Sequence, residues 1–84
     1  MATGREIENW LTARIAERLR LSPADVDVDA TFDRYEFSSL VAVELAGDLE
    51  DLLATPISPL CFYEYPTIAQ LADYLAGSET HRAG

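Results

Sequence analysis

Residues 37–45 read Phe-Ser-Ser-Leu-Val-Ala-Val-Glu-Leu and place two serines directly before a helical hydrophobic pattern. Serine is a strong helix N-cap, so this junction predicts a helix that starts at about Ser39. The first N–H groups of a helix lack intrahelical acceptors and lie at the positive end of its dipole. A phosphodiester on a serine oxygen is therefore well accommodated at this junction.

The pattern after the serines predicts an amphipathic helix from about Ser39 to Leu53. Apolar residues follow the i, i+3, i+4, i+7 spacing of a stripe that faces the core, namely Ala42, Leu45, Ala46, Leu49, Leu52 and Leu53. The same periodicity places a second set on the outward surface, namely Leu40, Glu44, Gly47, Asp48 and Asp51. Val41 and Val43 flank this surface, so part of it is predicted to be apolar and available for contact.

Helical patterns also flank this segment on both sides. A capping box at Thr3 and Glu6 predicts a first helix, whose apolar stripe is Ile7, Leu11, Ile15 and Leu19. Ser22-Pro23 ends it, and the following stretch to Phe37 reads as a long loop anchored by Val26, Val28, Phe32 and Tyr35. Ser58-Pro59 predicts a short helix that ends at about Tyr63.

The last helix is predicted from a second capping box, formed by Thr67 and Gln70. Its apolar stripe is Ile68, Leu71, Ala72 and Leu75, and Gly77 is predicted to end it. We therefore expect an all-α fold, a small antiparallel bundle of three long helices plus one short helix. Residues 1–77 form the predicted domain, and residues 78–84 are predicted to be a flexible C-terminal tail.

Composition limits the functions that the chain can have. The 84 residues are 49% hydrophobic, which suits one small packed domain, and carry a formal net charge of −9. This charge disfavours nucleic acid and anionic membranes as partners and favours basic protein surfaces. A single cysteine and the absence of an apolar leader predict a reducing, cytoplasmic location.

The serine junction and the segment Tyr-Glu-Tyr-Pro-Thr-Ile-Ala-Gln-Leu-Ala-Asp-Tyr-Leu, residues 63–75, closely resemble the acyl carrier proteins of polyketide and fatty-acid synthesis. The likeness is nearest to carrier domains of modular polyketide synthases and covers roughly residues 7–75. In that family, the serine of an Asp-Ser-Leu motif takes a 4′-phosphopantetheine arm from coenzyme A. The resemblance implies Ser39 as the attachment point, because Leu40 and the following Val-Glu-Leu match in spacing.

The resemblance also implies what the chain does and what it binds. It implies a monomeric, non-catalytic carrier that holds acyl or polyketide intermediates as thioesters on the arm, in the biosynthesis of secondary metabolites. The implied partners are a phosphopantetheinyl transferase and basic docking surfaces of ketosynthases and acyltransferases. Contact is expected through Leu40, Val41, Glu44, Asp48 and Asp51. A further hypothesis places the acyl chain between the second and third helices, lined by Leu45, Leu60, Phe62 and Ile68.

Ser38 departs from the family motif, which has aspartate at this position. Serine and aspartate are comparable N-caps, so folding is expected to be unaffected, but a carboxylate is lost from the transferase contact surface. This keeps open an alternative, a carrier-like interaction module that is not modified. The peptidyl carriers commonly show glycine with histidine or aspartate before the serine, and Phe37-Ser38 lacks them, which favours the acyl type.

Two other kinds of site are less consistent with the sequence. Asp25, Asp27, Asp29, Asp33 and Glu36 match the spacing of an EF-hand calcium loop. Ala30 occupies the position where that loop requires glycine, so a calcium-binding loop is disfavoured. Cys61 is read as a small buried hydrophobe, and the single histidine, His81, lies in the predicted tail, so no histidine-based nucleophile or metal site is predicted.

Overall fold

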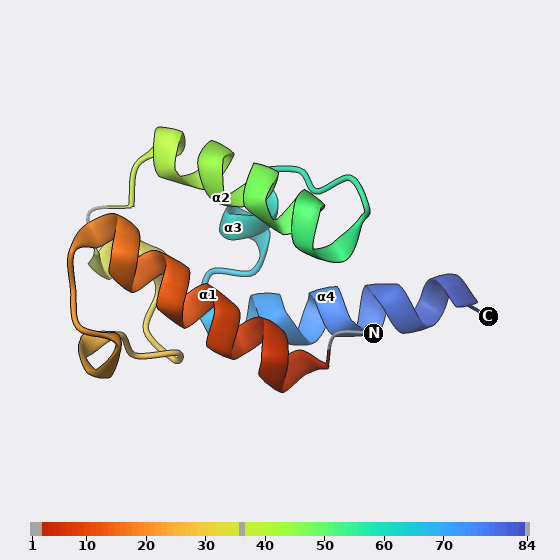
Figure 1. The fold of residues 1–84 in the computed structure, drawn as a ribbon, viewed down its shortest axis with the longest axis horizontal. Coiled ribbons are helices and arrows are strands. Elements are labelled where there is room, and N and C mark those ends of the chain that lie inside the picture. The colour runs from red at the N-terminus through yellow and green to blue at the C-terminus, as the bar shows by residue number, and fades with distance from the viewer. Residues whose placement is uncertain (1–2, 36, 84) are drawn as a thin grey trace.

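The computed structural model describes residues 3–35 and 37–83, and within this part of the chain it is helical with no named strand. The elements are α1 (Gly4–Leu19), η1 (Pro23–Asp25), η2 (Phe32–Arg34), α2 (Ser39–Leu53), α3 (Cys61–Glu64) and α4 (Ile68–Ala83). Helix α1 runs opposite to α2 and α4, and the short α3 connects the last two (Figure 1). The predicted bundle of three long helices and one short helix is confirmed.

Local hydrogen bonds cap both ends of helix α1. Thr3 Oγ1 accepts from Glu6 N at 3.1 Å and Glu6 Oε1 accepts from Thr3 N at 2.8 Å, which is the predicted capping box. Arg20 ends the helix in the left-handed conformation with φ 59°. There Leu21 N donates to Ala16 O at 2.8 Å, so a helix carbonyl gains a partner beyond the last turn.

The long loop between α1 and α2 is tied to the start of α4. It contains two 3₁₀ turns, η1 and η2, where the sequence predicted plain loop. Phe32 N donates to Pro66 O at 2.9 Å, and Ala69 N donates to Val28 O at 3.0 Å. Val26 and Phe32 are buried, and Val28 packs against the core, so the predicted anchoring by these residues is confirmed.

Helix α2 has the predicted bounds, and most of its core stripe is buried. Ala42, Leu45, Ala46 and Leu49 are at most 2% exposed, and Leu53 packs against the core. Leu52 was predicted to be buried, and this is wrong, because its side chain is 43% exposed. It lies at the edge of the helical stripe, beside Trp10 and Asp51 in a shallow surface hollow.

Both of the last two helices follow a predicted polar side chain, but their bounds differ from the prediction, since α3 begins at Cys61 with Leu60 as its N-cap and not at Pro59. Ser58 Oγ accepts from Leu60 N at 3.2 Å before α3, and Thr67 Oγ1 accepts from Gln70 N at 3.1 Å at the start of α4. The helix end predicted at Gly77 is wrong, since α4 continues to Ala83. No described glycine has a positive φ, so Gly77 does not adopt the left-handed conformation that ends helices.

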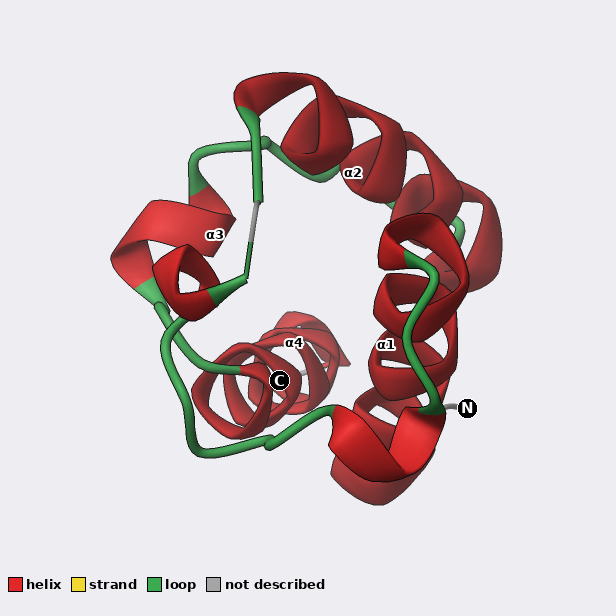
Figure 2. Ribbon diagram, turned by 90° about the vertical axis from the view of Figure 1, so that its left-hand side faces the viewer, coloured by secondary structure: helices red, strands yellow, loops and turns green. Residues whose placement is uncertain are grey.

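The core lies inside the ring that the four helices form when the molecule is viewed end on (Figure 2). Its fully buried large side chains are Ile7, Leu11, Ile15, Leu45, Leu49, Phe62, Ile68 and Leu71. They come from all four helices, so each helix is held by apolar burial against the others. Among the described residues, none of the helices combines the length and the apolar character that spanning a bilayer requires.

Candidate attachment site

Ser38 and Ser39 occupy the two positions at which α2 begins. Ser38 is the N-cap, with extended backbone (φ −79°, ψ 166°), and its Oγ accepts from Val41 N at 3.2 Å. Ala42 N donates to Ser38 O at 3.1 Å, which closes the first helical turn. Ser39 is the first helical residue, so its side chain is free of the capping role that Ser38 fulfils.

An aromatic cluster fixes the chain just before the serines. The Phe37 ring stacks on Phe32 with centroids 4.8 Å apart and lies 5.3 Å from the ring of Phe62. Phe32 and Phe62 are themselves in contact at 5.4 Å and are buried. Because Phe32 belongs to the long loop and Phe62 to α3, this cluster joins both segments to the start of α2.

Ser39 itself is exposed, and Tyr63 of α3 reaches its hydroxyl. Ser39 Oγ and Tyr63 Oη are 3.5 Å apart, and either atom can be the donor. The sequence did not indicate Tyr63 as a neighbour of the serine. The two residues are 24 positions apart, and no spacing rule connects the start of one helix to a separate four-residue helix.

The first turn of α2 suits a covalently attached phosphodiester. Residues 39–42 are Ser-Leu-Val-Ala, so no carboxylate in this turn repels a negative group. The N–H groups of the turn point toward its N-terminal end, where they favour negative charge. An exposed primary hydroxyl at this place is accessible to an enzyme, so the residues present fit a phosphopantetheine group.

Exposed apolar side chains accompany the serine on α2 and α3. Leu40 is 66% exposed, and three others are at least 54% exposed, namely Val43, Leu60 and Tyr63. The predicted exposure of Leu40 is therefore confirmed, whereas Val41 is half-buried and packs against the core.

The acidic residues of α2 are not all directed to solvent. Arg18 of α1 donates to Glu44 Oε1 at 2.6 Å and to Asp48 Oδ2 at 2.9 Å. The hydrogen bond to Asp48 raises the pKa of Arg18, and Glu44 adds to the effect. Asp51 is exposed. The predicted outward acidic surface is thus divided, because Glu44 and Asp48 are already paired within the molecule.

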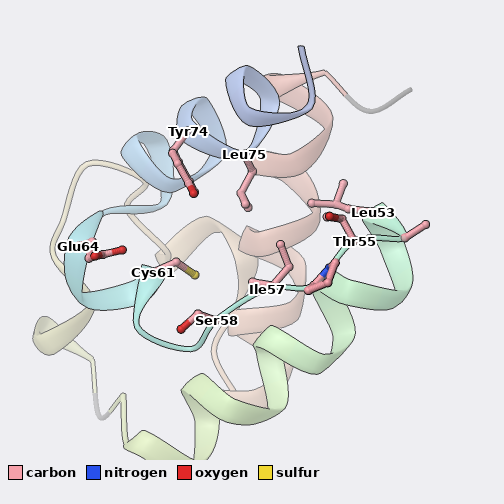
Figure 3. A pocket seen from close by; sticks show the side chains of 10 residues that line it. Leu53, Thr55, Ile57, Ser58, Cys61, Glu64, Tyr74 and Leu75 are labelled. Atoms are coloured by element: carbon pink, nitrogen blue, oxygen red, sulfur yellow. The ribbon is translucent and has the colours of Figure 1, made fainter. Parts of the chain in front are cut away.

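A cavity of about 330 Å³ lies between the end of α2, the following loop, α3 and α4 (Figure 3). Its lining includes Leu53, Ile57, Cys61, Tyr74 and Leu75. The lining predicted between the second and third helices is not the lining of this cavity. Leu45, Phe62 and Ile68 are buried in the core, and Leu60 is 63% exposed.

Cys61 borders this cavity and has the predicted character of a small buried hydrophobe. It is 5% exposed, and burial, together with the charge of Glu64, raises the pKa of its thiol to about 11. The thiol is therefore almost entirely protonated at neutral pH, which makes it a poor nucleophile.

The acidic loop uses its side chains for local hydrogen bonds. Asp27 Oδ1 accepts from Asp29 N at 2.9 Å, and Tyr35 Oη accepts from Asp27 N at 2.8 Å. Glu36, part of the EF-hand-like spacing, lies outside the described residues. Within residues 3–35 and 37–83, no three His, Cys, Asp or Glu side chains are grouped so that they could hold a metal ion.

Comparison with known proteins identifies the class to which this fold and site belong. Residues 9–75 match the family model of the phosphopantetheine attachment site. The fold is similar to a free-standing peptidyl carrier protein from Acinetobacter baumannii, with a TM-score of 0.87, 33% identity, and coverage of 90% of this chain and 95% of that one. It is also similar to an acyl carrier protein from Anabaena sp. PCC 7120 with a variant phosphopantetheinylation-site sequence, with a TM-score of 0.84, 38% identity, and coverage of 92% and 88%.

Curated relatives narrow the class further. The chain is 38% identical over 74 residues to a phenolphthiocerol/phthiocerol polyketide synthase of Mycobacterium tuberculosis, a match that covers 88% of this chain and 4% of that protein. It is 30% identical over 70 residues to the polyketide synthase PksN of Bacillus subtilis, covering 83% and 1%. The chain thus spans a small part of the length of these relatives.

The chain belongs to the acyl carrier protein family, of the polyketide synthase type. The family's covalent prosthetic group is phosphopantetheine, and the chain is a carrier that tethers intermediates on it. These comparisons do not favour the alternative of an interaction module without the arm. The Anabaena structure also shows that the carrier fold occurs with a variant modification site.

Proposed function

We propose that Ser39 is the residue that carries the 4′-phosphopantetheine group. The observation that supports this assignment is the exposed Ser39 hydroxyl on the first turn of α2, next to a separate serine that caps the helix. Ser38 Oγ is occupied by Val41 N, whereas Ser39 Oγ makes only a long contact with Tyr63 among the described residues. Both serines are exposed, and we assign Ser39 as the nucleophile because its hydroxyl does not cap the helix, whereas that of Ser38 does.

In the proposed modification, a transferase supplies coenzyme A and the general base. Ser39 Oγ attacks the phosphorus next to the pantetheine moiety and forms an O–P bond. The pyrophosphate bond breaks, adenosine 3′,5′-bisphosphate leaves, and the serine proton passes to the base on the transferase. The first-turn N–H groups of α2 stabilise the negative charge on the phosphate at Ser39. When bound, the arm supplies a terminal thiol that holds acyl groups as thioesters.

We further propose that the transferase and the enzymes of a polyketide synthase dock on α2 around Ser39. Leu40 offers the largest exposed apolar contact there, and the net charge of −9 favours basic partner surfaces. Asp51 is exposed for such a partner, whereas Glu44 and Asp48 are already paired with Arg18. Val41 contributes its exposed part only.

The remaining proposals concern the chain as a whole. We propose that it catalyses no reaction itself and acts as a monomer. The carrier domain is proposed to cover residues 1–77, because the family match ends at residue 75 and Leu75 belongs to the core. Residues 78–84 are proposed to be a C-terminal tail, although α4 continues through them to Ala83. A cytoplasmic location is proposed because a reducing compartment keeps the thiol of the arm free.

Intact-protein mass tests the assignment of Ser39. The chain is incubated with coenzyme A and a broad-specificity phosphopantetheinyl transferase, beside Ser39→Ala and Ser38→Ala variants. One added arm per chain in the wild type and in Ser38→Ala, and none in Ser39→Ala, is the expected result. An arm that persists in Ser39→Ala would reject the assignment.

A further inference from the structure

Tyr63 is held beside Ser39 by the packing of α3. Its neighbours Cys61 and Phe62 are 5% and 2% exposed, and they fix this short helix to the core. Within the helix, Tyr63 N donates to Leu60 O at 2.9 Å. The Tyr63 side chain is itself 57% exposed, yet its hydroxyl lies 3.5 Å from Ser39 Oγ. A short helix that is anchored in the core thus places a phenol beside the candidate attachment point.

We propose that Tyr63 is a positioning residue for the group attached to Ser39, and that its hydroxyl donates a hydrogen bond to a phosphodiester oxygen there. This inference rests on the proposed function of Ser39. Once Ser39 Oγ is esterified, it has no proton to donate, so Tyr63 becomes the donor of the pair. A phosphodiester carries a full negative charge, and hydrogen bonds to charged acceptors are shorter and stronger than neutral ones.

The group attached to Ser39 has hydrogen-bond donors on two separate elements. The first-turn N–H groups belong to α2 and the Tyr63 hydroxyl belongs to α3, so the donors that would meet a phosphate at Ser39 lie on different elements. Two anchors restrict the orientation of the phosphate more than one does. Tyr63 is therefore expected to set the direction in which the arm leaves the surface and to assist its transfer to Ser39.

Tyr63→Phe tests the inference, with Tyr74→Phe as the matched control. Both tyrosines are exposed, at 57% and 41%, so loss of either hydroxyl leaves the core intact. Tyr74 stacks on Tyr65 at 4.2 Å through its ring, which phenylalanine preserves. The phosphorus NMR resonance of the loaded proteins is compared, together with the ¹³Cζ shift of each tyrosine before and after loading.

The expected result is a shift of the Tyr63 ¹³Cζ resonance on loading, with Tyr74 unchanged. The phosphorus resonance is expected to move in Tyr63→Phe and to stay in place in Tyr74→Phe. Loading of Tyr63→Phe should have a kcat/KM roughly three- to tenfold lower, as expected for one hydrogen bond.

The contrary results separate the two proposals. In one contrary result, the wild-type chain is loaded at Ser39, but its Tyr63 resonance does not move and its phosphorus resonance matches that of Tyr63→Phe. This result would overturn the role of Tyr63 and leave the function of Ser39 intact. A folded wild-type chain that no transferase loads at Ser39 overturns both proposals.

Discussion

Arg18 of α1 donates to Asp48 of α2 at 2.9 Å, and its other terminal nitrogen pairs with Glu44 on the preceding turn of the same helix. One cation therefore holds two acids of the helix that starts at Ser39. This arrangement links the position of α2 to α1 by charge as well as by apolar packing. It also withdraws two acidic groups from the charge that α2 offers to a partner.

Removal of this pairing should lower the stability of the fold, whereas removal of Asp51, which makes no ion pair with any described residue, should not. Asp48→Asn is expected to lower the melting temperature by up to about 5 °C, since exposed ion pairs contribute little and the domain is small. Asp51→Asn is the matched control on the same helix and should leave the melting temperature unchanged. Thermal denaturation followed by circular dichroism measures both, and an equal response of the two variants would show that the Arg18 pair is not stabilising.

The side chain of Leu40 should matter for partners and not for folding. It is 66% exposed beside Ser39, so Leu40→Ala is expected to keep the melting temperature within about 2 °C and to slow loading by the transferase several-fold. Leu52→Ala, an exposed leucine at the other end of α2, serves as control and should load at the wild-type rate. Equal loading rates for Leu40→Ala and wild type would remove Leu40 from the docking surface.

Ser38 should contribute to stability as an N-cap. Ser38→Ala removes the acceptor of Val41 N and is expected to cost about 1 kcal/mol in the free energy of unfolding. Ser38→Asp retains a cap and should be about as stable as the wild type. Urea denaturation measures both differences.

The loading rate of Ser38→Asp tests whether serine in place of the family's aspartate at position 38 affects recognition by the transferase. If the missing carboxylate limits recognition by the transferase, Ser38→Asp is loaded faster than the wild type. An unchanged loading rate would place the transferase contact elsewhere on α2.

The Cys61 thiol should resist modification in the folded chain. Burial raises its pKa to about 11 from an ordinary value of 9.0, so a thiol reagent at pH 8 should react with it only after denaturation. Because an unfolded chain loses this proton at lower pH than the folded one, Cys61 stabilises the fold below about pH 9, and this contribution is lost as the pH rises toward about 11.

Thiol titration of the native chain provides the readout for Cys61. The unmodified protein should show no rapidly reacting thiol, and the loaded protein should show one, which belongs to the arm. Rapid reaction of the unmodified native chain would contradict the burial of Cys61.

Local signals in the sequence were sufficient for most of the fold. The capping residues Thr3, Ser38 and Thr67 and the apolar stripes define the helices, because their physical effects act within one or two turns. Gly77 failed as a helix end, since glycine permits the left-handed conformation and does not enforce it. Leu52 is exposed although it belongs to the apolar stripe, because its exposure depends on how the other helices pack against α2, which its own helical pattern does not encode.

The candidate site was predictable only in part. The position of Ser39 at the start of a helix was predictable from the pattern of that helix. Its contact with Tyr63, and the pairing of Glu44 and Asp48 with Arg18, are contacts between separate helices. Such contacts depend on how separate elements pack, and no local spacing indicates them. The cavity beside Cys61 was missed for the same reason, because the end of α2, a loop, α3 and α4 form it together.

Localisation of the arm by fragment-ion mass spectrometry tests the central assignment most directly. After loading with coenzyme A and a transferase, the peptide that contains residues 37–45 is fragmented between Ser38 and Ser39. We predict a phosphopantetheine mass on Ser39, with Ser38 unmodified. An arm on Ser38 or on a residue outside this peptide, or no arm on a folded chain under any transferase, would contradict the assignment.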